Sequence, residues 1–169
     1  ASRLERRFRV AIKPKVCVSC AMSQNSPSGI LSPDAADFGG TVPVLVIGGG
    51  GCGLCAALSA KEHGAEVLVL ERDASALGTT AMSTGLIPAP GSRFMREKGL
   101  ADSPEQFAAD IMKKTKGLTD PDMALHLAKE GAPTVEWLAD VQGVPLSVVD
   151  SFQYPGHSAK RMQIGRAHV

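Results

Sequence analysis

The sequence predicts an α/β domain in which a parallel β-sheet is flanked by helices. An apolar, β-branched run from Val42 to Ile47 ends at four consecutive glycines. A helix-forming segment, Leu54 to His63, follows and is ended by Gly64, and a second apolar run covers Glu66 to Leu70. A strand, a glycine turn, a helix and a strand within about thirty residues make a βαβ unit, whose two strands must be parallel.

Length, composition and charge are those of one globular domain. The 169 residues are 44% hydrophobic and carry a formal net charge of +1. After residue 40, twelve Lys and Arg residues stand against fourteen acidic ones without clustering, so we expect no nucleic-acid partner. Charged residues such as Lys61 and Arg72 interrupt the apolar stretches, so we expect no transmembrane segment.

Residues 1–41 are predicted to be a disordered leader or translated upstream sequence. The first 40 residues hold six Lys and Arg against three acidic residues, many serines and no sustained apolar periodicity. The early arginines resemble a mitochondrial transit peptide, whereas a start at Ala1 rather than methionine is equally compatible with upstream sequence. The expected compartment is the cytoplasm, with the mitochondrion as the alternative.

The four cysteines form two CxxC pairs, Cys17 with Cys20 and Cys52 with Cys55. Such pairs can bind zinc, but 31 residues separate the two pairs, against about 15 to 20 in common zinc sites. We therefore expect no metal. Cys52 and Cys55 are interpreted instead as small apolar side chains at the start of a tightly packed helix, and their free thiols favour a reducing compartment.

Further elements are expected after residue 100. Ser103 and Gln106 can form a capping box at the start of one helix, and Asp120 begins a second. Pro133 is expected to begin a third helix, and a strand-like run from Val144 to Val149 follows.

The glycine turn has the spacing of a dinucleotide-binding site. Gly48, Gly50 and Gly53 satisfy GxGxxG directly between the first strand and the helix. Gly48 allows the tight turn, Gly50 lets the backbone approach a pyrophosphate, and Gly53 lets helix and strand pack closely. The helix N-terminus then binds the phosphates through N–H groups and its dipole. The predicted fold is therefore a Rossmann-like FAD/NAD(P)-binding domain, and the missing Walker lysine disfavours a nucleoside triphosphatase.

Glu71 stands at the end of the second strand, with Arg72 next to it. A carboxylate at this place accepts hydrogen bonds from the adenosine ribose hydroxyls and repels a phosphate, so NADP is disfavoured. The alternative is that both residues form a solvated strand end.

The segments VIGGGGCGLCAA, VLVLERD and GTTAMSTGLIPAPG resemble the FAD-binding domain of the fumarate reductase and succinate dehydrogenase flavoprotein family. Later segments resemble its soluble fumarate-reductase-like and 3-ketosteroid-dehydrogenase-like members. The resemblance implies FAD as cofactor and a second loop that wraps it. The residues expected to bind FAD are Gly48, Gly49, Gly50, Gly51, Cys52, Gly53, Glu71, Arg72, Gly78, Thr79, Thr80, Ser83 and Gly85.

The resemblance also implies hydride transfer between the flavin and a carbon–carbon bond beside a carboxylate or carbonyl of a small molecule, a dicarboxylate or a ketosteroid. It places the family's catalytic residues beyond this chain, so none is assigned, and the oligomeric state is unknown. His157 and Arg161 are expected either to line the substrate side or to be solvated in a surface turn. An NAD-dependent dehydrogenase, a non-catalytic binding protein and an inactive truncated fragment remain alternatives.

The resemblance implies that residues 42–163 are the N-terminal part of an incomplete FAD-binding domain. The last six residues, 164–169, read IGRAHV, which a common sequencing adapter encodes as ATC GGA AGA GCA CAC GTC. We therefore expect these residues to be a library artefact that plays no part in the fold.

Overall fold

A computed structural model describes residues 40–76 and 78–165, which fall into two compact units divided between Met82 and Ser83. The two units are described separately. The expectations for residues 1–39 and for residues 166–169 lie outside the described part of the chain.

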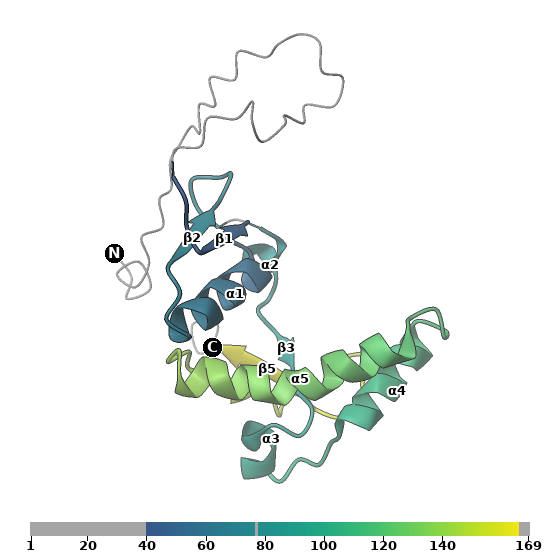
Figure 1. Cartoon of the computed structure of the whole chain (residues 1–169). Helices are drawn as coiled ribbons and strands as arrows, with labels where there is room; N and C mark the ends of the chain where they lie inside the picture. Colours follow the sequence, from purple (N-terminus) through teal and green to yellow (C-terminus); the bar gives the residue numbers. More distant parts are fainter. Residues whose placement is uncertain (1–39, 77, 166–169) are drawn as a thin grey trace. The chain divides into compact units, whose positions relative to one another are not determined.

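The first unit contains the predicted βαβ arrangement (Figure 1). Strand β1 (Val44–Ile47) and strand β2 (Val67–Leu70) are parallel and in register, with Val44 opposite Val67. Helix α1 (Gly51–Glu62) connects them and packs against both. The short helix α2 (Thr79–Met82) ends the unit. The α/β fold class and the parallel strand pair are thus confirmed.

Helix α1 begins at Gly51 rather than at the predicted Leu54, so Gly51, Cys52 and Gly53 form its first turn. Glycine has a low helix propensity, but Gly53 faces the sheet at a point where only a hydrogen atom fits, and this packing favours the helical conformation. Ala57, one turn further along the same face, is completely buried. The helix therefore contacts the sheet through small residues.

In its described part, the second unit consists of three helices and a small antiparallel sheet of three strands. The elements are β3 (Ile87–Pro88), α3 (Arg93–Glu97), α4 (Pro104–Lys114), α5 (Pro121–Asp140), β4 (Leu146–Val148) and β5 (Met162–Gly165). Strand β5 lies between β3 and β4 and pairs antiparallel with both. Helices α4 and α5 lie side by side (Figure 1). Strands β3 and β5 and helix α3 were not predicted from the sequence. Ile164 and Gly165, which were expected to play no part in the fold, lie in β5.

Two helix starts are confirmed by their caps. The Ser103 hydroxyl accepts a hydrogen bond of 3.1 Å from the Gln106 N–H, and the Asp120 carboxylate accepts bonds from the two N–H groups at 122 and 123. The second half of the capping box does not form, because the Gln106 side chain donates to the Ser158 hydroxyl instead.

The prediction of a separate helix beginning at Pro133 is wrong, because α5 runs through that residue without a break. Proline removes one helical hydrogen bond and costs about 3 kcal/mol in a helix interior. Tertiary packing offsets this cost. Ala124, Ala128 and Val135 are buried on one face of α5, and a Cβ at Gly131 on that face would lie 2.9 Å from the Pro88 carbonyl oxygen. The helix is held against β3 on both sides of the proline.

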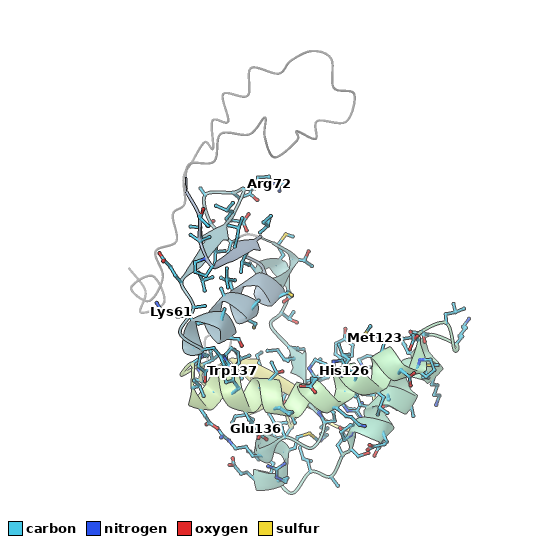
Figure 2. The ribbon with its side chains drawn as sticks, in the orientation of Figure 1. Lys61, Arg72, Met123, His126, Glu136 and Trp137 are labelled. Atoms are coloured by element: carbon cyan, nitrogen blue, oxygen red, sulfur yellow. The ribbon has the colours of Figure 1, made fainter. Side chains whose placement is uncertain are left out.

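The core of the second unit is formed by Ala89, Val135 and Leu146, with four partly buried hydrophobic residues around it. Glu136 lies on the side of α5 that faces α3 (Figure 2), where its carboxylate accepts a 2.6 Å hydrogen bond from the Arg93 N–H.

Along residues 40–76 and 78–165, no helix has the length and apolar character needed to cross a membrane.

Candidate functional site

The glycine turn between β1 and α1 has the geometry that the GxGxxG spacing predicts. Gly48 has a φ of +101°, which residues with a side chain rarely adopt, and its N–H donates to the Leu70 carbonyl at 2.7 Å. A Cβ at Gly53 would lie 2.0 Å from the Gly48 carbonyl oxygen, so no larger residue fits there. A Cβ at Gly50 would meet no atom within 4 Å, so the backbone there faces open space.

Several N–H groups at the start of α1 are available to a ligand. The Gly51 N–H donates to the Thr80 hydroxyl at 3.1 Å, and the Leu54 N–H donates to the Gly50 carbonyl at 2.9 Å. The N–H groups of Gly50, Cys52 and Gly53 have no acceptor among the residues that the structure describes. A helix N-terminus with unpaired donors and a positive dipole end stabilises an anion such as a diphosphate.

Glu71 lies beside this turn, because β1 and β2 are parallel and end at the same edge of the sheet. Its Oε2 accepts a 2.7 Å hydrogen bond from the Gly49 N–H, and its Oε1 accepts one of 3.2 Å from the Asp73 N–H. These bonds, with that from Gly49 the stronger cause, lower the pKa of the carboxyl below its ordinary value. The ionised carboxylate keeps further lone pairs for ribose hydroxyls.

Arg72 does not contact the glycine turn. Its guanidinium pairs with the neighbouring Asp73 at 3.3 Å, and its side chain is 90% exposed. Figure 2 shows it on the loop that follows β2. An exposed pair of this kind contributes little to stability.

The second predicted loop is divided between the two units. The Gly78 carbonyl accepts from the N–H groups of residues 81 and 82, and Thr79 and Thr80 lie in α2, where the Thr80 hydroxyl reaches Gly51. Ser83 and Gly85 belong to the second unit, where the Gly85 N–H donates to the Ser83 hydroxyl at 3.1 Å. The structure thus brings together the glycine turn, Glu71 and Thr80, and leaves Ser83 and Gly85 unplaced relative to them.

The two cysteines in α1 differ in exposure. Cys52 is exposed, so its interpretation as a packed apolar side chain is wrong, whereas Cys55 is half-buried. The next residue, Gly53, faces the sheet, and the helical repeat turns the Cys52 side chain away from it. Within residues 40–76 and 78–165 there is no group of three or more side chains placed to bind a metal.

Arg161 is completely buried, so its interpretation as a solvated surface residue is wrong. Its guanidinium forms two bonds to Asp102, of 2.6 and 2.9 Å, and one of 2.6 Å to Asp110. It also lies 4.7 Å from the centre of the Phe107 ring. With its donors directed at two carboxylates, this arginine is not available to clamp a substrate. Asp102 lies 59 positions away, and nothing in the spacing indicated the pair.

His157 is half-buried between the rings of Phe107 and Tyr154, each 5.3 Å away. Burial, followed by the nearby Arg161 charge, lowers the pKa of this histidine below its ordinary value. Its Nδ1 has no hydrogen-bond partner in the described part of the chain. The three aromatic side chains line a pocket of about 150 Å³ in the second unit. His126 is exposed on α5 (Figure 2), and His63 is exposed at the C-cap of α1.

The first unit fits the adenosine diphosphate part of a dinucleotide. The unpaired N–H groups at the start of α1 suit a diphosphate, and the ionised Glu71 carboxylate at the adjoining strand end suits a ribose diol. Gly50 leaves space for the nucleotide to approach the backbone. These features do not by themselves distinguish FAD from NAD.

Comparisons with known proteins make that distinction. Residues 43–168 match the FAD binding domain. Urocanate reductase from Eggerthella lenta is 34% identical over 123 residues, which are 73% of this chain and 20% of that protein. The open conformation of a flavocytochrome c3 fumarate reductase superposes with a TM-score of 0.71 at 29% identity, covering 79% of this chain and 23% of that one.

A third relative is the 3-ketosteroid-Δ4-(5α)-dehydrogenase of Rhodococcus jostii RHA1, whose crystal structure superposes with a TM-score of 0.57 at 30% identity. The superposed region covers 66% of this chain and 23% of the dehydrogenase chain. The chain therefore spans about a fifth of the length of the relatives that it matches. The resemblance seen in the glycine turn, in the strand-end carboxylate and in the later segments is confirmed. The chain belongs to the FAD binding domain family, and its cofactor is FAD.

Proposed function

We propose that the intact protein containing this chain is an FAD-dependent oxidoreductase that transfers hydride to or from a carbon–carbon bond next to a carboxylate or carbonyl. The observation that carries the proposal is the set of unpaired N–H groups at the start of α1, placed beside the ionised Glu71 carboxylate. The proposal is further supported by three relatives, whose names give urocanate, fumarate and a 3-ketosteroid as their substrates.

In this proposal four residues of the first unit bind defined parts of the cofactor. The N–H groups of Gly50, Cys52 and Gly53 bind the diphosphate, and Glu71 binds the adenosine ribose. Gly49, Gly51, Arg72, Gly78, Thr79 and Thr80, which lie near this turn in the sequence or in the first unit, are assigned to the same cofactor. Ser83 and Gly85 are kept in the set on the family resemblance alone. The bound flavin supplies the hydride acceptor or donor.

Two parts of the chain have a positioning role in the proposal. Thr80 holds the second loop against the first turn of α1, since its hydroxyl accepts from the Gly51 N–H. The Gly49 N–H orients Glu71, so the carboxylate is fixed before the ribose binds. Groups that protonate the substrate or bind its carboxylate are expected in the part of the protein beyond this chain.

The substrate class that we propose is a small dicarboxylate or a ketosteroid, in which a carboxylate or carbonyl group lies next to the reacting carbon–carbon bond. The compartment that we propose is the cytoplasm, with the mitochondrion as the alternative. An NAD-dependent dehydrogenase would bind nicotinamide nucleotide in place of flavin and would show no flavin absorbance.

The test is to purify the intact protein and record its visible spectrum, and then to titrate the apoprotein with FAD and with NAD. Turnover is assayed with fumarate, urocanate and a 3-ketosteroid, each with a redox dye as electron donor or acceptor. We expect bound flavin, and loss of its binding in a Glu71→Ala variant but not in a Gly40→Ala control, because Gly40 has no neighbour within 4 Å. A colourless protein that binds NAD and not FAD would overturn the proposal.

A further inference from the structure

We propose that Cys52 and Cys55 are a reversible redox pair whose oxidation to a disulfide weakens the binding of FAD at the start of α1. This inference rests on the proposed function, because it assigns a form of regulation to the same site. It starts from the exposed position of one thiol within the cofactor-binding turn and from the closeness of the second.

The two thiols lie on the same side of α1. Gly53 and Ala57 face the sheet, so residues 52 and 55, which are three positions apart, lie together on the outer side of the helix. Burial raises the pKa of the Cys55 thiol, and the charge on the nearby Cys52 raises it further. Cys52 is exposed and open to attack, whereas Cys55 is half-buried behind it.

Helix geometry allows the disulfide but requires a local change. Residues three apart in a helix have Cα atoms about 5 Å apart, within the range of about 4.4 to 6.8 Å that disulfides tolerate. Their Cβ atoms are about 5 to 6 Å apart, whereas a disulfide needs about 3.5 to 4.5 Å. Closing the bond therefore draws the two residues together by roughly 1 to 2 Å and distorts the first turn of α1.

That distortion reaches the proposed ligand-binding groups. The N–H groups of Cys52 and Gly53 are two of the unpaired donors at the helix start, and Gly53 has no room to move toward the sheet because the Gly48 carbonyl oxygen occupies that space. A shift of this size takes an N–H group out of hydrogen-bonding range of a fixed phosphate oxygen. The oxidised turn is thus a poor diphosphate site.

The chemistry balances with a hydroperoxide as oxidant. The Cys52 sulfur attacks the terminal peroxide oxygen, the O–O bond breaks, and water or an alcohol leaves as the sulfenic acid forms. The Cys55 sulfur then attacks the Cys52 sulfur, the S–O bond breaks, the oxygen leaves as water, and the disulfide forms. The two thiols lose two electrons and two protons in total, and the peroxide is reduced. A cellular dithiol reverses the reaction by exchange.

The coupling is reciprocal, because ligand and disulfide compete for the same turn. FAD bound over the start of α1 shields Cys52, so the loaded protein is protected from oxidation. The disulfide therefore forms only in protein without bound FAD. It regulates the binding of the cofactor and not the turnover of substrate.

The experiment uses the intact protein in a Cys17→Ser/Cys20→Ser background, which removes the other CxxC pair. The apoprotein is treated with one equivalent of hydrogen peroxide, and the peptide containing residues 52 and 55 is mapped by mass spectrometry. FAD affinity is then measured before and after oxidation with diamide, which removes hydrogen and adds no oxygen. A Cys55→Ser variant is the matched control, since it keeps Cys52 but has no second thiol.

We expect the peptide from the apoprotein to lose the mass of two hydrogen atoms, to regain it with dithiothreitol, and to be protected by saturating FAD. Oxidation should weaken FAD binding at least about tenfold, the effect of losing one hydrogen bond to a charged group, and should leave the Cys55→Ser variant unchanged. No disulfide in the apoprotein, or a disulfide with unchanged FAD affinity, overturns the inference while the proposed function stands. A reduced protein that binds no FAD overturns both.

Discussion

Replacing Gly53 by alanine tests the geometry of the cofactor turn most directly. The added Cβ would lie 2.0 Å from the Gly48 carbonyl oxygen and 3.1 Å from the Val46 Cγ1. Separations under 3.0 Å do not occur for real Cβ atoms, so α1 and the Gly48 turn must move apart by at least 1.0 Å, the difference between 3.0 and 2.0 Å. Because the obstructing atom belongs to the backbone, no side-chain rotation relieves the clash.

Overpacking of this kind costs about 1 to 3 kcal/mol, and a backbone clash belongs at the upper end. A cost of about 3 kcal/mol corresponds to a factor of about 150 in the folding equilibrium, since 1.4 kcal/mol is tenfold. We therefore expect the Gly53→Ala variant of the intact protein to unfold at a clearly lower urea concentration and to lose FAD.

Two matched variants separate stability from binding. Gly40→Ala should behave as the parent protein, and Gly50→Ala should keep the parent's urea midpoint while binding FAD more weakly, because a Cβ at either position meets no protein atom. If Gly53→Ala unfolded at the same urea concentration as Gly40→Ala, the close approach of α1 to the Gly48 turn would be refuted.

The other predictions concern the second unit, the strand-end carboxylate and the chain on its own. Arg161→Met should destabilise the intact protein by about 3 to 5 kcal/mol in urea unfolding, because it leaves Asp102 and Asp110 buried without a counter-charge. Adding Asp102→Asn and Asp110→Asn should recover part of the lost stability. An unchanged urea midpoint for Arg161→Met would contradict this prediction. Glu71 has a lowered pKa in the folded protein, so its stabilising bonds are fully present above the unfolded value of about 4.3 and are lost as the pH falls through the lower folded value. Unfolding of a Glu71→Gln variant should therefore vary less with pH below about 5 than that of the parent, and parallel curves would speak against the Gly49 and Asp73 bonds. The 169-residue chain alone should retain FAD weakly and be poorly soluble, since Leu45 and Ile47 of β1 are 50% and 83% exposed; a stable yellow product of this length would contradict that expectation.

Local sequence was sufficient to predict the first unit. The β-branched runs, the glycines and the spacing to Glu71 all lie within a short stretch of chain, and the βαβ unit that they form has one permitted strand direction. Ser103 and Asp120 were also predictable, because a cap depends on residues two or three positions away. The resemblance to flavoproteins rested on these segments and on later ones in the second unit.

The features that depend on contacts between residues far apart in the sequence were decided only by the tertiary structure. Arg161 was expected at a surface turn or a substrate and instead pairs with Asp102, 59 positions earlier. Helix α5 continues through Pro133 because its small-residue face packs against residues 88–90, and β5 exists because β3 and β4 pair with its two edges. Sequence patterns report the preferences of neighbouring residues, whereas these features depend on desolvation and packing between segments that meet only when the chain has folded.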